Sequence, residues 1–388
     1  MSSSFTMPRE IISGKHALES EAAKEIFRRS GKKALIITGP NLMKRGICSP
    51  LEDVLQEEKI DYVFYSDIPG EPDDQMVRAA LEAYRKNECD FLIALGGGSP
   101  VDLMKAVGAL TERNGNITDY MMKNIDWSVP TMIAIPTTAG TGSEATQFTI
   151  ITDSQKEIKM LLKGTSLMPE YAIVDSRFTV TAPPSVTAAT GLDALCHCVE
   201  AFTSRKAQPM SDTFALSAVK RIFAYLPVCF RDGENEEARE QMSLAALEAG
   251  IAFNNASVTL IHGMSRPIGA LFHVPHGLSN AMLMEECLAY ALSGAYDRFA
   301  ALGRAIGAAG KDDDAQTASK KFMEKLISLK EELNIPTPEV YGIDREKYFA
   351  SVEKMTRDAM DSGSPGNTIR NVQESDVLEI YKRVWNGR

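Results

Sequence analysis

The sequence of 388 residues lacks the features that mark a secreted or membrane-bound protein. Its six cysteines are scattered without the paired spacing of a zinc finger, so free buried thiols are expected. The first residues contain no cationic segment followed by an apolar stretch, and no run is long and apolar enough to cross a bilayer. These absences predict a cytoplasmic protein.

An excess of basic charge is also lacking. The formal net charge is -10 and no block rich in Lys and Arg occurs, which disfavours nucleic acid and anionic membranes as partners. Hydrophobic residues at 44% and charged residues at 24% are close to the globular average, which argues against disordered and collagen-like classes. A chain of this length predicts two domains.

The first half of the sequence alternates short apolar runs with helical patterns. The runs predict four strands: Lys33–Thr38, Tyr62–Ser66, Asp90–Leu95 and Pro130–Pro136. Helices are predicted over Asp73–Asn87 and Asp102–Thr111. Apolar strands separated by helices predict a parallel sheet that is covered on both faces.

The second half carries no further strand signal after Pro183 and Pro184. Apolar residues at helical spacing predict helices in six segments: Val186–Phe202, Met210–Tyr225, Glu236–Ala256, Asp297–Ala309, Ala315–Leu333 and Asp376–Trp385. We therefore expect an α/β domain over residues 1–182 and an all-α domain over residues 183–388. A crevice between two such domains is a common location for a ligand site.

Two turns rich in small residues follow predicted strands. The first, Gly96-Gly-Gly-Ser-Pro-Val-Asp102, opens a helix, where glycines let the backbone approach a pyrophosphate. It is neither a Walker loop nor the G-x-G-x-x-G pattern, and a tight turn without a ligand is the alternative. The second, Pro136-Thr-Thr-Ala-Gly-Thr-Gly-Ser-Glu144, offers hydroxyl groups suited to a ribose or nicotinamide. Turns at the carboxyl ends of parallel strands face the same crevice, which favours a nucleotide site.

Histidines are few but concentrated. Four of the five lie in one third of the chain: His197, His262, His273 and His276. Asp193 and His197 lie four residues apart, which places them on one face of a helix. One Asp with three His would suit Fe(II) or Zn(II) and leave room for a substrate oxygen. Cys196 and Cys198 flank His197 but point away from its face, so we interpret them as packing residues.

Taken in order, these segments resemble the iron-containing (group III) alcohol dehydrogenases over almost the whole chain. The resemblance is carried by the two turns and by four further motifs: Gly191-Leu-Asp-Ala-Leu-Cys-His197, Phe253-Asn-Asn-Ala256, His262-Gly-Met-Ser-Arg-Pro-Ile-Gly269 and Pro275-His-Gly277. It implies a Rossmann-like dinucleotide-binding domain followed by a helical domain, the architecture of dehydroquinate synthase. It further implies a homodimer or larger homo-oligomer.

The resemblance also implies the ligands of each cofactor. A divalent metal, Fe(II) or sometimes Zn(II), would be bound by Asp193, His197, His262 and His276. NAD or NADP would be bound by residues of both turns and one lysine: Gly97, Gly98, Ser99, Asp102, Thr137, Thr138, Thr141, Ser143 and Lys159.

Three positions depart from the family pattern. Many relatives have a second His four residues after the third metal ligand, whereas this chain has Arg266 there and an additional His273. His273 is the candidate for taking the proton, with water or a cofactor ribose hydroxyl as the alternative. Many NAD-using relatives have Asp after the first strand, where this chain has Gly39. A glycine removes the repulsion of a 2′-phosphate, so we predict that NADPH is accepted, with Lys44 and Arg45 as candidate phosphate partners.

Arg266 has two interpretations. It could bind an anionic group of the substrate through a two-pronged hydrogen bond, or form an ion pair that braces its turn. A guanidinium cannot act as a base, because it stays protonated.

The implied reaction is the interconversion of a small primary alcohol or diol and its aldehyde, with a metal acting as Lewis acid and a nicotinamide carrying the hydride. One alternative is a metal-dependent lyase similar to dehydroquinate synthase, which shares the fold plan and bound NAD. The Phe253-Asn-Asn-Ala and Pro-His-Gly segments resemble the dehydrogenases instead. A non-catalytic metal- or nucleotide-binding protein is hard to reconcile with both sites being intact.

Overall fold

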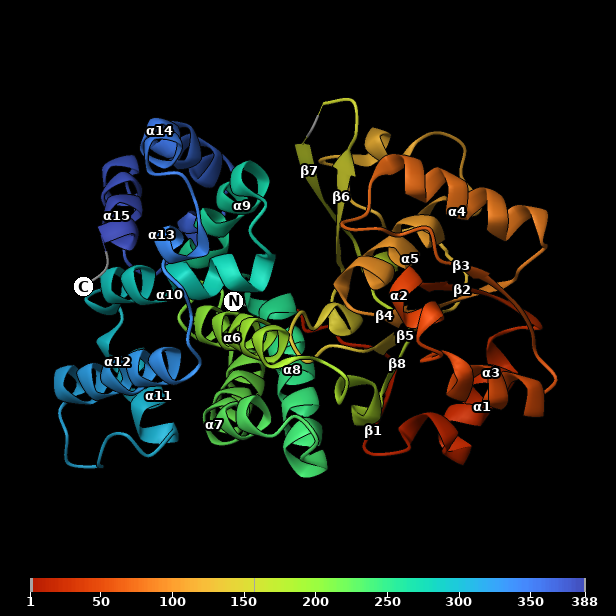
Figure 1. Cartoon of the computed structure of the whole chain (residues 1–388), viewed down its shortest axis with the longest axis horizontal. Coiled ribbons are helices and arrows are strands. Elements are labelled where there is room, and N and C mark those ends of the chain that lie inside the picture. Colours follow the sequence, from red (N-terminus) through yellow and green to blue (C-terminus); the bar gives the residue numbers. More distant parts are fainter. Residues whose placement is uncertain (1–2, 157, 387–388) are drawn as a thin grey trace. The chain divides into compact units, whose positions relative to one another are not determined.

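The computed structural model describes residues 3–156 and 158–386, which form two compact units (Figure 1). One unit is Thr6–Thr181, and the other begins at Ala182 and includes the N-terminal residues up to Phe5. The first contains the parallel sheet and the second is helical, so the predicted fold class is confirmed. All six cysteines are free and buried, as predicted.

The α/β unit is built on a six-stranded parallel sheet in the order β1-β8-β5-β4-β2-β3. The chain runs from β2 to β3 on one side and then returns to place β4 on the other side of β2. The carboxyl ends of β2 and β4 therefore flank a switch point of the kind where α/β proteins bind ligands. The strands are β1 (Glu10–Ser13), β2 (Lys33–Thr38), β3 (Asp61–Tyr65), β4 (Phe91–Gly96), β5 (Met132–Pro136) and β8 (Tyr171–Val174).

Helices cover both faces of this sheet because its strands are apolar on both sides. In β2, Leu35 and Ile37 belong to one buried cluster, whereas Ala34 and Ile36 belong to the other. The first cluster is covered by α4 (Asp74–Lys86) and α5 (Gly98–Leu110). The second is covered by α1 (Glu21–Ser30) and α3 (Ser49–Glu57). The short α2 (Pro40–Lys44) follows β2, and a separate antiparallel hairpin consists of β6 (Phe148–Asp153) and β7 (Ile158–Lys163).

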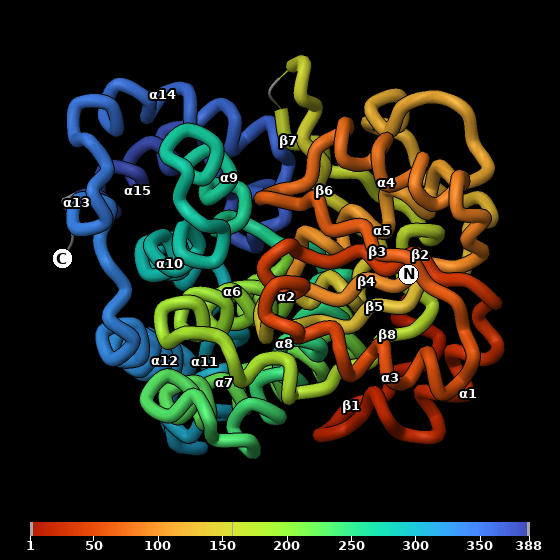
Figure 2. The backbone as a smooth tube through the Cα atoms, turned by 45° about the vertical axis from the view of Figure 1, so that its right-hand side comes forward, coloured from red at the N-terminus to blue at the C-terminus, as the bar shows by residue number. Residues whose placement is uncertain are grey.

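The helical unit begins with α6, α7 and α8, which pack closely on one another. α10 packs against both α6 and α9, so α6 lies beside two consecutive helices from later in the chain (Figure 2). The helices are α6 (Pro184–Phe202), α7 (Pro209–Arg231), α8 (Glu236–Ala256), α9 (Leu260–Phe272), α10 (His276–Leu292), α11 (Tyr296–Ala305), α12 (Ala315–Glu332), α13 (Pro338–Tyr341), α14 (Arg345–Asp361) and α15 (Glu374–Asn386).

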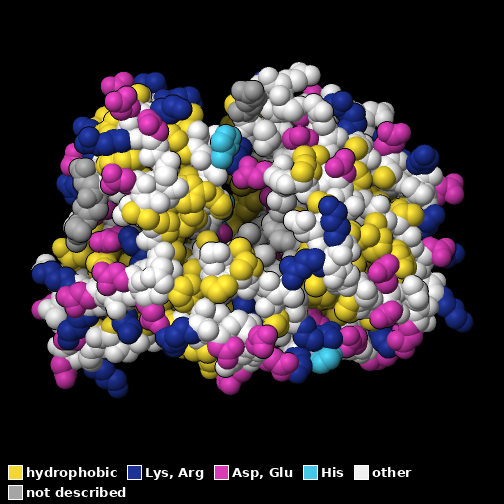
Figure 3. Space-filling model, viewed as in Figure 1, with side chains coloured by type: hydrophobic (Ala, Val, Ile, Leu, Met, Phe, Trp, Pro, Cys, Tyr) yellow, Lys and Arg dark blue, Asp and Glu magenta, His cyan; other side chains and the backbone are white. Residues whose placement is uncertain are grey.

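One described helix corrects the expectation that no segment could span a membrane. α7 is long and apolar enough by length and composition, and α8 with α9 would add a second candidate only as one span bent by 106°. α7 nevertheless packs against α6, α8, α11 and α12, as a core helix does. On the face shown in Figure 3, Lys and Arg side chains are interspersed with Asp and Glu rather than gathered in one patch.

Candidate active site

The four predicted metal ligands lie together in the helical unit. One ligand atom from each of Asp193, His197, His262 and His276 falls within 4.8 Å of the others. Asp193 and His197 are one turn apart on α6, His262 lies in the first turn of α9, and His276 is the first residue of α10. A Cβ at Gly277 would lie 2.5 Å from the carbonyl oxygen of Ala189, so only glycine lets the start of α10 come this close to α6.

The separations of these atoms fit a single ion. Asp193 Oδ1 lies 3.6 Å from His262 Nε2 and 3.7 Å from His276 Nε2. Two ligands that are each about 2.1 Å from one ion lie about 3–4 Å apart, depending on the angle between them. The rings of His197 and His262 are stacked at 4.4 Å, and the ring of Phe253 covers His197 at 4.2 Å. A carboxylate and three imidazoles in this arrangement form a donor set suited to Fe(II) or Zn(II).

Asn280 occupies the centre of this donor set. Its amide nitrogen lies 2.7 Å from Asp193 Oδ1, 3.1 Å from His262 Nε2 and 3.2 Å from His276 Nε2. Its amide oxygen is buried and has no hydrogen-bond partner among the residues that the structure describes. The positive end of the Asn280 amide dipole thus faces three of the four ligand atoms. A bound cation would likewise place positive charge against these atoms.

Charges in the donor set shift the pKa values of its members. Burial alone would raise the pKa of Asp193, but His197, His276 and His262 together hold it well below its usual range. Burial opposes protonation of His262, but the Glu200 and Asp193 carboxylates raise its pKa to about 9. The two buried carboxylates, Asp193 and Glu200, therefore favour a positive charge within the donor set.

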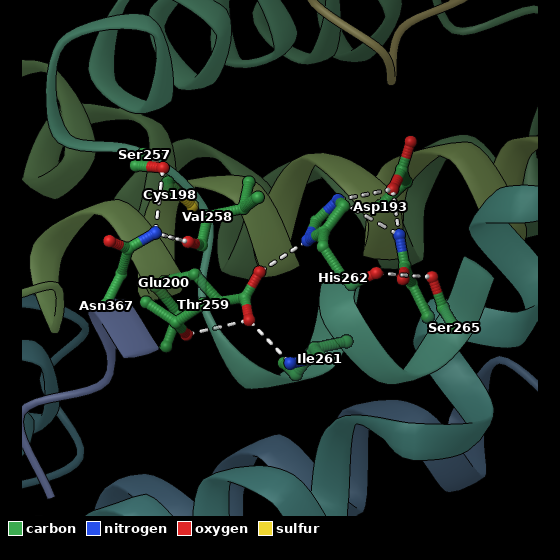
Figure 4. Close-up of polar contacts among 12 residues, drawn as sticks. Asp193, Cys198, Glu200, Ser257, Val258, Thr259, Ile261, His262, Ser265 and Asn367 are labelled. Carbon is green, nitrogen blue, oxygen red and sulfur yellow. Dashed lines mark hydrogen bonds and ion pairs between the residues drawn. The ribbon is translucent and has the colours of Figure 1, made fainter. Parts of the chain in front are cut away.

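Glu200 is a residue that the sequence analysis missed. One carboxylate oxygen accepts hydrogen bonds from the Thr259 hydroxyl at 2.8 Å and the Ile261 backbone N–H at 2.6 Å (Figure 4). The other oxygen contacts His262 Nδ1. Metal-binding histidines commonly donate their second ring N–H to a carboxylate, which fixes the tautomer and the ring orientation. Glu200 therefore leaves His262 Nε2 free to face Asp193.

Asn367 holds the segment that precedes His262. The side-chain amide of Asn367 donates to the Ser257 hydroxyl at 3.1 Å and to the Val258 carbonyl at 3.0 Å (Figure 4). Asn367 lies in a short 3₁₀ turn, Pro365–Asn367, which also packs against Gly263. The start of α9 is thus held by contacts from both Glu200 and Asn367.

Two further predicted residues lie outside the group of four. His273 ends α9 with a left-handed backbone (φ 54°), and it is exposed. Its role in proton transfer stays a prediction. Arg266 lies one turn after His262 on α9, which continues through Pro267 to Phe272.

The two glycine-containing turns lie next to each other in the α/β unit. Gly96 and Pro136 are paired across β4 and β5, and the Thr137 N–H donates to the Gly96 carbonyl at 2.9 Å. A Cβ at Gly98, the first residue of α5, would lie 3.1 Å from the side chain of Thr141. A Cβ at Gly97 would lie 3.4 Å from that of Thr138.

Buried polar contacts hold these turns in place. The Asp102 carboxylate accepts from the Ser143 hydroxyl at 2.8 Å and from the Ile150 N–H at 3.1 Å. Lys105, which the sequence analysis missed, donates to the Ser143 carbonyl at 2.7 Å and the Thr146 hydroxyl at 2.9 Å. Burial lowers the pKa of Lys105 to about 8, although Asp102 opposes the shift. Asp102 and Ser143 therefore hold the two turns together. Ser99, in the first turn of α5, is partly exposed.

The remaining predicted cofactor residues are accessible. Gly39 follows β2, and a Cβ placed on it would meet no atom within 4 Å. Lys44 and Arg45 are exposed, and no described acid forms an ion pair with either. Lys159 on β7 forms an ion pair with Glu71 at 2.6 Å.

Comparison with known proteins identifies the class of this arrangement. Residues 8–176 match the family model "Iron-containing alcohol dehydrogenase", and residues 187–385 match "Fe-containing alcohol dehydrogenase family, C-terminal". The chain is 33% identical over 386 residues to choline dehydrogenase of Bacillus subtilis (strain 168), covering 98% of this chain and 95% of that protein. It is also 33% identical over 396 residues to the NADPH-dependent butanol dehydrogenase of Clostridium saccharobutylicum, covering 99% and 98%.

A solved structure agrees with these matches. The crystal structure of a 1,3-propanediol oxidoreductase superposes with a TM-score of 0.94 at 29% identity, covering 99% of this chain and all of that one. The chain belongs to the family of iron-containing alcohol dehydrogenases. It is an oxidoreductase, so the lyase alternative is not supported.

Proposed function

We propose that this protein interconverts a small primary alcohol or diol and its aldehyde at an Fe(II) or Zn(II) ion held by Asp193, His197, His262 and His276. The observation that supports the proposal most is the approach of four ligand atoms to within 4.8 Å in a buried part of the helical unit. When bound, the ion supplies Lewis acidity toward the substrate oxygen, and hydride is exchanged with the nicotinamide.

The protein's own residues have separate parts in this scheme. Glu200 orients His262, and the Phe253 ring shields His197 from water on one side. His273 is the proposed proton acceptor, supported only by its position three residues before His276. We propose that residues 1–182 act as the nucleotide-binding domain and residues 183–388 as the metal-binding domain.

The cofactor would be NAD or NADP. Its pyrophosphate would lie on Gly97, Gly98 and Ser99, since glycines permit close backbone approach at the start of α5. Thr137, Thr138 and Thr141 would line the ribose and nicotinamide, with Asp102 and Ser143 bracing these turns and Lys159 near a ribose hydroxyl.

Two further properties are proposed. Six free buried thiols support a reducing compartment, the cytoplasm. A homodimer or larger homo-oligomer is proposed from the resemblance described above, and light scattering of the purified protein would measure it.

The proposed function is tested by a reductase screen. Purified protein is loaded with Fe(II) or Zn(II) and given short aldehydes with NADH or NADPH, and loss of nicotinamide absorbance is compared with alcohol formed. We expect stoichiometric conversion. Fully metal-loaded protein that reduces none of the aldehydes would contradict the proposal.

Gly39 leads to a prediction about cofactor choice. The open space beside it would admit a 2′-phosphate, and Lys44 and Arg45, which follow closely in sequence, are exposed and pair with no described acid. Gly39→Asp should lower the ratio of kcat/KM for NADPH over NADH by about 10-fold or more, from roughly 1.4 kcal/mol or more of charge repulsion.

The matched control is Gly39→Asn, which adds the same volume without the charge and should change the ratio much less. Steady-state kinetics with both cofactors measure the effect. A wild-type protein with no measurable NADPH activity would show that the argument from Gly39 is wrong.

A further inference from the structure

Arg266 is a basic residue that lies one helical turn after His262, one of the proposed metal ligands. Neither a hydrogen bond nor an ion pair to Arg266 occurs among the residues that the structure describes. The second interpretation from the sequence, an ion pair that braces the turn, therefore has no acid to support it. A guanidinium that is partly withdrawn from water and unpaired is unfavourable unless an anion joins it.

The helix directs Arg266 toward the side of the ligands. α9 is unbroken from Leu260 to Phe272, so residues four apart lie on the same face, and Arg266 follows His262 by one turn. The opposite face is occupied by the core, where Met264 contacts the Cys287 thiol at 3.6 Å. The charge of Glu200, which touches His262, also acts on Arg266.

Glu200 cannot serve as the partner of Arg266. Its two carboxylate oxygens are already engaged by the Thr259 hydroxyl, the Ile261 N–H and His262. Asp193 is engaged by Asn280 and faces the histidines. Both buried acids of the proposed metal site are thus engaged by other groups, and the guanidinium stays available to a ligand.

We infer that Arg266 binds an acidic group at the far end of the substrate, which makes the preferred substrate a short aldehyde carrying a carboxylate, sulfonate or phosphonate. One helical turn separates Arg266 from His262 by about 6 Å along the axis. A substrate of three or four carbons could therefore extend from an ion held by the four ligands, at its carbonyl end, to Arg266, at its acidic end. The planar guanidinium forms two parallel hydrogen bonds with such oxyanions.

This inference rests on the proposed function, and substrate pairs of equal length test it. The metal-loaded protein is assayed with 4-oxobutanoate and butanal, and with a quaternary ammonium alcohol in the oxidative direction. We expect wild type to prefer 4-oxobutanoate and to oxidise the cationic alcohol poorly. Arg266→Ala should lower the ratio of kcat/KM for 4-oxobutanoate over butanal by about 10- to 100-fold, mainly through KM.

Arg266→Lys keeps the charge but loses the paired geometry, so it should recover only part of this ratio. Arg357→Ala, which removes an exposed arginine on α14, is the control and should leave the ratio as in wild type. A second readout does not use turnover. Modification of Arg266 by phenylglyoxal, located by mass spectrometry, should be slowed by 4-hydroxybutanoate but not by butan-1-ol.

Several results would overturn the inference. One is an equal loss of kcat/KM on both aldehydes in Arg266→Ala. Another is a rise confined to KM for the nicotinamide cofactor, which would show that Arg266 binds a phosphate of the cofactor instead. A third is efficient oxidation of the cationic alcohol by wild type. Butanal reduction without any preference for the acid overturns this inference alone. Absence of any aldehyde reduction overturns the proposed function itself.

Discussion

Replacement of His262 or His276 by Ala should abolish metal retention and turnover together. Each change removes one of four ligand atoms that lie within 4.8 Å of one another, and three remaining ligands cannot close the same coordination sphere. Because Asp193 and Glu200 are buried carboxylates, loss of the ion also leaves their negative charge without its balance. Metal content by elemental analysis and aldehyde reduction are measured on the same samples.

The control for this pair is His16→Ala. His16 is the one histidine of the sequence that lies in the α/β unit, where it is exposed and pairs with Glu19. This variant should keep its metal and its activity. Full metal content in His262→Ala and His276→Ala would show that the ligand assignment is wrong.

Glu200→Gln should weaken metal affinity by about 10- to 100-fold, the usual effect of removing a partner behind a metal ligand. The amide can turn in two ways. With its nitrogen toward His262, it donates to Nδ1 and forces the proton onto Nε2, the atom that must bind the metal. With its nitrogen toward Ile261, two N–H donors face each other.

Competition with a chelator of known affinity measures this effect, and thermal unfolding of the metal-free protein separates it from a loss of fold. Glu248→Gln is the matched control, since Glu248 is a partly buried carboxylate of α8 paired with Arg221. A drop in metal affinity no greater than that of the control would contradict a positioning role for Glu200.

The sequence predicted the site to the extent that its residues follow local spacing. Asp193 and His197 could be placed on one face because they are four residues apart on one helix. Glu200 lies three residues after His197 and on the same face, but carboxylates on helices usually face solvent, so its burial could not be foreseen. Asn280 and Asn367 act through contacts between segments distant in sequence, for which spacing carries no signal.

The fold was predictable where apolar runs are continuous and less so elsewhere. β2 was predicted over its full length, since every residue from Ala34 to Thr38 is buried. β6 and β7 were missed because this hairpin lies outside the parallel sheet and mixes polar with apolar residues on both faces. α7 extends beyond the predicted Tyr225 to Arg231 because packing against α6 and α8 stabilises the helix through Pro227.

The unequal burial of the four proposed ligands leads to an expectation about exchange of a bound ion. The side chains of Asp193 and His262 are only 3% and 5% exposed, whereas that of His276 is 38% exposed. If an ion is bound by these four residues, a chelator would approach it most readily from the side of His276, and this imidazole would be the first ligand to detach. Substrate bound at the same opening would block that route. Metal loss should thus be slow in the resting enzyme and slower still during turnover, so that residence time of the ion depends on the supply of substrate.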